Sequence, residues 1–170
     1  MIIIFCTVIL TGLFQNLTAQ GDDPMKAWQD FMTSGSMHKW LAGQVGTWEA
    51  EVSQWMDSTA PPTKSKATDV VTMSMNGLYQ VGNFSSTMKG MPMRGQSTLS
   101  YDNAMKLFVL AWIDNFESDI VYMTGAYDEK TKTLNLKGKQ TDPMRGKDTD
   151  IRQENKYIDD NKYTMTMYRA

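Results

Sequence analysis

The chain has 170 residues, the size of one ordinary domain and enough to bury a hydrophobic core without disulfides or metal ions. Its 17 Lys and Arg against 19 Asp and Glu residues give a net charge of −2, and no basic block is present that would attract phosphates or anionic lipid. Nucleic acid is therefore excluded as an expected partner. The 15 methionines supply soft apolar surface that fills a core or lines an adaptable cavity.

The N-terminus has the pattern of an export signal. Residues 2–14 form an almost unbroken apolar run, shorter than the roughly 20 residues of a membrane span, and a more polar stretch with Ala19 follows. We predict a signal peptide over residues 1–19, a bacterial periplasmic or secreted protein, and no stable membrane anchor after cleavage. The alternative is a buried N-terminal strand or helix. Cys6 is the one cysteine and lies in this segment, so the mature chain would have no thiol for disulfides, catalysis or metal binding.

Residues 20–44 are predicted to form two short helices. Asp23 followed by Pro24 combines a helix N-cap with a proline at the first helical position, and apolar side chains then recur at helical spacing up to Met32. A Ser-Gly-Ser break follows, and the same spacing returns up to Gly43, which is typical of a helix end.

From residue 45 onward the apolar period changes to two, which predicts strands. Beyond a first strand around Trp48, we expect strands at residues 65–75, 78–88, 93–101, 107–113, 120–127, 133–140, 149–157 and 163–168. Short turns separate them, and Asn76-Gly77 is the clearest hairpin signal. Consecutive antiparallel hairpins without helical crossovers predict a mainly β fold, an up-and-down antiparallel β-barrel of about nine to ten strands over residues 45–170.

Ordered blocks of residues from Met37 to the C-terminus point to one family. The blocks are His38-Lys39-Trp40-Leu41-Ala42-Gly43-Gln44-Val45-Gly46-Thr47-Trp48, Asn76-Gly77-Leu78-Tyr79, Gly90-Met91-Pro92-Met93-Arg94-Gly95, Tyr101-Asp102-Asn103, Trp112-Ile113-Asp114-Asn115, Gly125-Ala126-Tyr127-Asp128 and Asp142-Pro143-Met144. With these blocks in this order, the chain resembles the bacterial family called domain of unknown function (DUF) 1579.

The resemblance implies a calycin-like barrel, related in architecture to lipocalins and fatty-acid-binding proteins. Gly46-Thr47-Trp48 is similar to the Gly-x-Trp element that opens the first lipocalin strand. The family brings no settled activity, so the resemblance is an argument about fold. Such sequences usually continue past the strand at residues 163–168, whereas this one stops at Ala170. We therefore expect either a sequence that lacks its last strand or a barrel with an open edge.

Enzyme chemistry finds little support in the residues. His38 is the one histidine, which excludes a histidine-rich zinc site and disfavours a Ser-His-Asp triad. We expect it on a helix surface; the alternative is an axial haem ligand folded over a barrel mouth. The pairs Asp22-Asp23 and Asp159-Asp160 fit caps and turns better than metal or acid/base sites. The sequence favours a protein that is not an enzyme and has no cofactor, with a carboxylate hydrolase as the remaining catalytic alternative.

The strands expected to line the barrel carry polar groups among apolar ones. The alternation of side chains along these strands predicts that the following residues point inward: Ala67, Asp69, Val71, Met73, Met75, Leu134, Leu136, Ile151, Gln153, Asn155, Tyr157, Met165 and Met167. A buried Asp69, Gln153 or Asn155 without a partner would cost about 1–3 kcal/mol. The interior is therefore either hydrogen-bonded within itself or able to host a ligand.

These patterns predict binding or carriage of a small, mainly apolar molecule in the barrel. The expected walls are Trp48, Met73, Phe84, Trp112 and Met165, and the expected polar anchors are Asp69 and Gln153. The competing hypothesis is a non-catalytic structural or assembly module that presents Leu107, Val109, Ala111 and Ile113, or their opposite face, to a protein partner. A homo-oligomer is compatible with either function.

Overall fold

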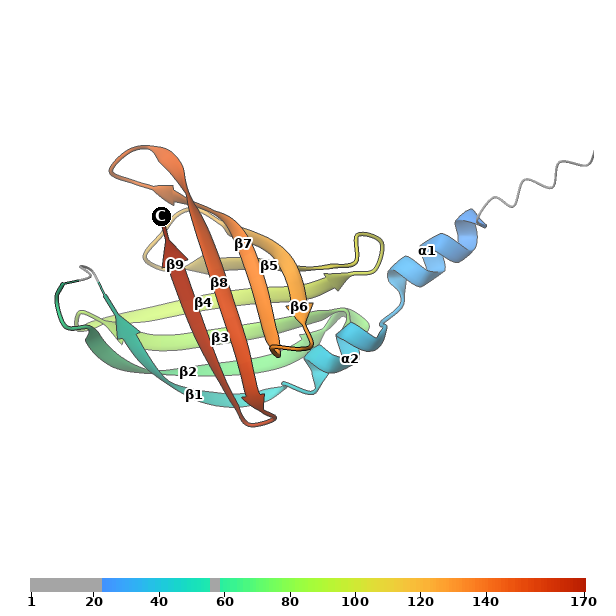
Figure 1. Ribbon diagram of the computed structural model, residues 1–170, viewed down its shortest axis with the longest axis horizontal. Helices are drawn as coiled ribbons and strands as arrows, with labels where there is room; N and C mark the ends of the chain where they lie inside the picture. Colours follow the sequence, from blue (N-terminus) through green and yellow to red (C-terminus); the bar gives the residue numbers. More distant parts are fainter. Residues whose placement is uncertain (1–22, 56–58) are drawn as a thin grey trace, which may run out of the picture.

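The computed structural model describes residues 23–55 and 59–170, which form two short helices followed by nine strands (Figure 1). The helices are α1 (Pro24–Met32) and α2 (Ser36–Ala42); the strands are β1 (Gly46–Gln54), β2 (Thr63–Ser74), β3 (Tyr79–Met88), β4 (Met91–Asp102), β5 (Leu107–Asp114), β6 (Val121–Asp128), β7 (Thr133–Asp142), β8 (Lys147–Asp159) and β9 (Lys162–Arg169), with a 3-10 turn, η1 (Met75–Gly77), before β3. Each strand pairs antiparallel with the next, in the sheet order β1 to β9. The mainly β, up-and-down prediction is confirmed.

The sheet curls on itself into a half-barrel. In Figure 1, β8 and β9 cross in front of β1 to β4, so the two ends of the sheet face each other. Within the described residues, β1 pairs with β2 alone and β9 with β8 alone, which leaves a seam between β1 and β9. The architecture agrees with the calycin-like barrel that the resemblance implied.

The hairpin turns follow from local residue chemistry. Asn76 and Gly77 adopt φ values of +57° and +79°, a left-handed backbone that Asn and Gly tolerate better than most residues. Met88 pairs directly with Met91, so the turn between them has two residues, also with positive φ. Both predicted turns are confirmed. Met75 is a correction: it begins η1 and is 71% exposed, so it does not line the interior as strand alternation predicted.

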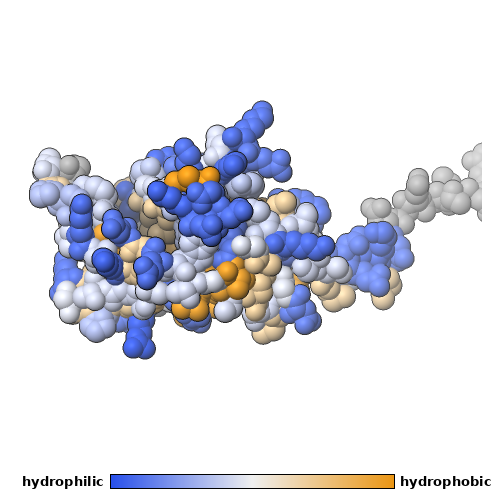
Figure 2. All heavy atoms as spheres, turned by 90° about the horizontal axis from the view of Figure 1, so that it is seen from below, coloured by the Kyte–Doolittle hydropathy of each residue, from blue (hydrophilic) through white to orange (hydrophobic). Residues whose placement is uncertain are grey.

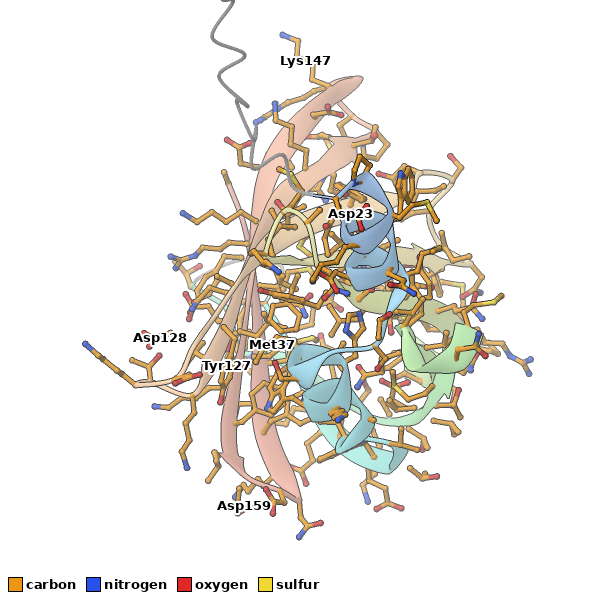
Figure 3. All side chains as sticks on the ribbon, turned by 90° about the vertical axis from the view of Figure 1, so that its right-hand side faces the viewer. Asp23, Met37, Tyr127, Asp128, Lys147 and Asp159 are labelled. Atoms are coloured by element: carbon orange, nitrogen blue, oxygen red, sulfur yellow. The ribbon has the colours of Figure 1, made fainter. Side chains whose placement is uncertain are left out.

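The core lies at the end of the half-barrel that α2 covers; Figure 3 looks onto this end. Leu41 of α2 is fully buried, and its backbone oxygen accepts a 2.8 Å hydrogen bond from Nε2 of Gln80. The Trp40 ring meets Tyr127 at 4.6 Å and Tyr157 at 5.0 Å between ring centroids. These aromatic and amide contacts fix α2 across the mouth and fill this half of the interior.

His38 belongs to this closed end, which corrects the expectation of a surface residue. Its side chain is 1% exposed, and Nδ1 accepts a 3.1 Å hydrogen bond from the backbone N–H of Gly35 at the start of α2. The ring also bonds the Tyr101 backbone, and burial lowers its pKa. The helical spacing did not predict this burial, because His38 accepts a hydrogen bond from the backbone N–H at the start of α2, as Glu or Gln does in a capping box. With both polar contacts inside the protein, the ring is not placed to bind haem iron.

The α1 helix projects from the barrel (Figure 1). Asp23 caps it, accepting a 3.0 Å hydrogen bond from the Met25 N–H as predicted, and none of its residues is buried. Its last turn is held by Nδ2 of Asn103, which donates to backbone oxygens of α1 and of Thr33, the latter at 2.8 Å. No described helix has the length and apolar character needed to span a bilayer. The predicted signal peptide lies outside the described residues.

Candidate ligand-binding site

The seven residues predicted to line a ligand site lie on the inner face of the sheet. Residues paired directly across strands share a face, as do residues two apart on one strand. Trp48 pairs with Asp69, Asp69 with Phe84, and Phe84 with Gly95. The same register extends this face to Met73, Trp112, Gln153 and Met165.

Asp69 stands out on this face because one of its carboxyl oxygens has no partner. Oδ1 is buried and accepts no hydrogen bond. Desolvation raises the pKa of the Asp69 carboxyl above its usual value. Gly82 makes room for it: a Cβ at this position would lie 3.0 Å from Asp69 Oδ1 and 2.6 Å from Ser97 Oγ. The carboxyl therefore lies over a backbone that carries no side chain.

Two pairs of aromatic rings flank Asp69. Trp48 meets Tyr163 at 5.1 Å between centroids, with the rings 75° apart, and Phe84 meets Trp112 at 5.8 Å and 70°. Because Trp48 and Phe84 are the direct strand partners of Asp69, the pairs lie on either side of it. All four rings are only half-buried. We call Trp48, Asp69, Phe84, Trp112 and Tyr163 the Asp69 cluster.

The polar atoms of the two indole rings are already satisfied. Trp48 Nε1 donates to the Gln44 backbone oxygen at 2.9 Å, and Trp112 Nε1 donates to Asp114 Oδ2 at 2.8 Å. Gly95 lies beneath the Trp112 ring, where a Cβ would overlap it. The indoles are thus held by their edges, and their apolar surface remains for contact with another group.

Gln153, the second predicted anchor, is satisfied within the protein. It is 6% exposed, and Nε2 donates a 3.0 Å hydrogen bond to Oδ1 of Asn155, which is 7% exposed. Both lie on β8, in the part of the interior that Leu134 and Leu136 fill. Of these two predicted anchors, Asp69 alone has a buried side-chain atom without a hydrogen-bond partner.

The two predicted methionine walls lie apart from the aromatic rings. Met73 packs against the closed core near α2, and Met165 is 55% exposed on β9. Sequence reasoning omitted Tyr163, whose pKa is raised by burial and by the charge of Asp69. Its signal was available, since it precedes the inward-directed Met165 by two residues on one strand and therefore shares its face.

Two open hollows mark the described surface. One, of about 430 Å³, lies on the outer side of β6 and β7 and includes Tyr122 and Lys137. The other, of about 410 Å³, is lined by Asn83, Phe84, Ser85, Arg94 and Gly95. Because the side chains of Asn83, Ser85 and Arg94 alternate with the inward-directed residues, this hollow lies on the outer side of β3 and β4. Figure 2, viewed from the side of β1 and the β8–β9 turn, shows a mostly hydrophilic surface with a recess whose walls are partly apolar.

Residues 33–170 match the family described as "Protein of unknown function (DUF1579)". The chain belongs to the DUF1579 family. No curated protein matches it. The matched region of this DUF1579 protein holds α2, all nine strands and the whole Asp69 cluster, and it begins after α1. Because the family description assigns no activity, function has to be argued from the site itself.

Proposed function

We propose that this DUF1579 protein binds a small, mainly apolar ligand at the Asp69 cluster. The observation that carries the proposal is the buried, unpartnered Oδ1 of Asp69 between two pairs of half-buried rings. A buried acceptor left unsatisfied costs about 1–3 kcal/mol. A barrel whose interior served only as a core would have no use for such a group at this position, whereas a ligand that approaches Asp69 would pair it.

The contrast between the two halves of the interior supports this proposal. Under α2, the polar atoms of Gln80 and His38 have partners and the side chains are closely packed. Around Asp69, the aromatic rings are half-buried and β1 and β9 are unpaired with each other. A site with apolar walls, a polar anchor and an opening to solvent is the usual form of a small-molecule site.

Native mass spectrometry of the full chain, purified without denaturation from its own host, tests the proposal. We expect a bound small molecule in the wild type that is lost in Trp112→Ala, and partly retained in Trp112→Phe because the aromatic wall persists. The control is Trp28→Ala, which removes a 60% exposed indole on α1 and should retain the ligand. A wild-type protein that carries no molecule, or equal retention by Trp112→Ala and Trp28→Ala, would refute the proposal.

An assembly module is the second candidate function, and α1 supplies the observation that favours it. Met25, Trp28 and Met32 are 73%, 60% and 60% exposed on this projecting helix. The β5 surface named from the sequence is less available, since Ile113 alone of its four residues is exposed rather than half-buried. The occupant would be a second copy of the chain, and the same mass spectra distinguish the roles: a dimer lost in Trp28→Ala indicates assembly.

Export to the periplasm or the exterior is part of the proposed function. Its support is the apolar run at residues 2–14 and the absence of cysteine after Cys6 in the sequence. Fractionation of the native host, followed by N-terminal sequencing of the purified protein, tests it. We expect an N-terminus near Gln20 in the exported fraction; an intact N-terminus in the cytoplasmic fraction would overturn the prediction.

A further inference from the structure

The Asp69 carboxyl lies on the inner face without a cation to neutralise it. The three ion pairs found among the described residues are Lys26–Asp30, Arg145–Asp142 and Arg152–Glu154, none of which involves the Asp69 cluster. On β2 itself, Lys64 and Lys66 alternate with Asp69 and therefore project from the outer face. A negative charge at Asp69 thus has no partner of opposite charge within the described protein.

The surroundings of Asp69 are those that attract an organic cation. Trp48 and Tyr163 form one aromatic wall and Phe84 and Trp112 the other. The faces of such rings carry partial negative charge, so a cation held over them is stabilised, and more strongly when it is desolvated. The carboxylate and the aromatic faces lie on one concave surface, and both favour a ligand with a positive charge.

We propose that the ligand of the Asp69 cluster is an organic cation, an ammonium group attached to an apolar body. The ammonium group lies at Asp69, and the apolar body lies against the flanking rings. The inference rests on the proposed function and adds the charge of the ligand to it. A fatty-acid carboxylate is disfavoured at this site, because it would place a second negative charge beside Asp69.

Three probes of equal chain length separate charge from apolar contact: octyltrimethylammonium, 1-octanol and octanoate. Each is titrated into the full chain with ¹⁵N-labelled indoles, and the five Trp resonances are followed. We expect the Trp48 and Trp112 resonances to shift and that of Trp28 on α1 to stay in place. The cation should bind about tenfold or more tightly than octanol, which corresponds to about 1.4 kcal/mol, and octanoate should bind most weakly.

Two variants with the same change of net charge complete the test. Asp69→Asn should weaken octyltrimethylammonium about tenfold and leave octanol unchanged, because the amide keeps the shape of the side chain and loses its charge. Asp150→Asn, on an exposed β8 residue, should change neither affinity. The unperturbed resonances of the free variants report that they are folded.

The outcomes distinguish this inference from the proposed function. If octanol binds at Trp48 and Trp112 as tightly as the cation, or Asp69→Asn leaves cation binding intact, the cation inference is wrong and the apolar site stands. That result is expected if Asp69 is protonated and acts as a neutral group. If none of the three probes shifts either resonance at millimolar concentration, both the inference and the proposed function are wrong.

Discussion

Replacing Asp69 with Asn is expected to stabilise the free protein at neutral pH. The wild type holds a carboxyl oxygen that is buried without a partner, and such a group costs about 1–3 kcal/mol. Asn keeps a polar atom at the position of Oδ1 but carries no charge, so the expected gain is the part of this cost that the charge adds, about 1–1.5 kcal/mol. For a domain of this size, that gain raises Tm by roughly 2–6 °C.

The pH dependence of this gain identifies its cause. Desolvation raises the pKa of Asp69 in the folded state, so the folded protein favours the protonated carboxyl. Stability from this group is fully present below the unfolded pKa, about 3.9, and is lost as pH rises through the raised folded pKa. Asp69→Asn has no such group, so its advantage should be smallest at the acidic end and reach its full size above the folded pKa.

Urea unfolding of the wild type and Asp69→Asn between pH 4 and pH 8 measures this difference. Tyr163 stays neutral in this pH range, because burial and the charge of Asp69 both raise the pKa of its hydroxyl. Asp150→Asn serves as the control and should follow the wild type, since Asp150 is exposed. A variant less stable than the wild type at neutral pH, or an advantage that is constant with pH, would show that Asp69 is well accommodated and would remove the argument for a ligand.

Three further predictions test the surroundings of the site. Gly82→Ala should destabilise the fold by about 1–3 kcal/mol and weaken cation binding, because the new Cβ would lie 2.6 Å from Ser97 Oγ. Urea unfolding and the indole titration measure the two effects, and unchanged values would show that the Ser97 side chain does not crowd this position. His38→Gln should flatten the acid side of the stability profile: the lowered folded pKa of His38 means that its contribution is present above about pH 6.5 and is lost as pH falls, and an unchanged profile excludes this source. Asn103→Ala should release the last turn of α1 and speed trypsin cleavage at Lys26 without changing ligand affinity; cleavage at the wild-type rate would show that these hydrogen bonds do not hold the helix.

The strand pattern was predictable because it depends on local periodicity. Alternation located all nine strands, and the Asn76-Gly77 and Lys89-Gly90 turns fixed two hairpins. Once register is set, alternation also determines which side chains share a face, and Trp48, Asp69 and Phe84 share one. The failure at Met75 has the same origin, since the period of two stops where the backbone turns.

The contacts within the inner face were not predictable from the sequence. Alternation alone does not show that Gln153 bonds Asn155 two residues later while Asp69 keeps an unpartnered oxygen. Nor does it bring Tyr163 of β9 against Trp48 of β1, because that contact depends on how far the sheet curls rather than on any strand pairing. His38 was misplaced for a related reason: its role is to bond the start of its own helix against Tyr101, a tertiary contact.

The division of the interior has a thermodynamic consequence that links stability to binding. The half under α2 is satisfied by the protein's own groups, so ligand binding should change it little. The half around Asp69 carries an unmet hydrogen-bonding group, so a ligand that binds the folded state alone adds stability by mass action, about 2.7 kcal/mol at one hundred times its Kd. A variant that binds about tenfold more weakly gains only about 1.4 kcal/mol at the same concentration, so octyltrimethylammonium should raise the Tm of the wild type more than that of Asp69→Asn and bring the two values together. That convergence of the two Tm values would tie the cost of the buried carboxyl to its use, since a group that only destabilises the fold would leave the difference between them unchanged.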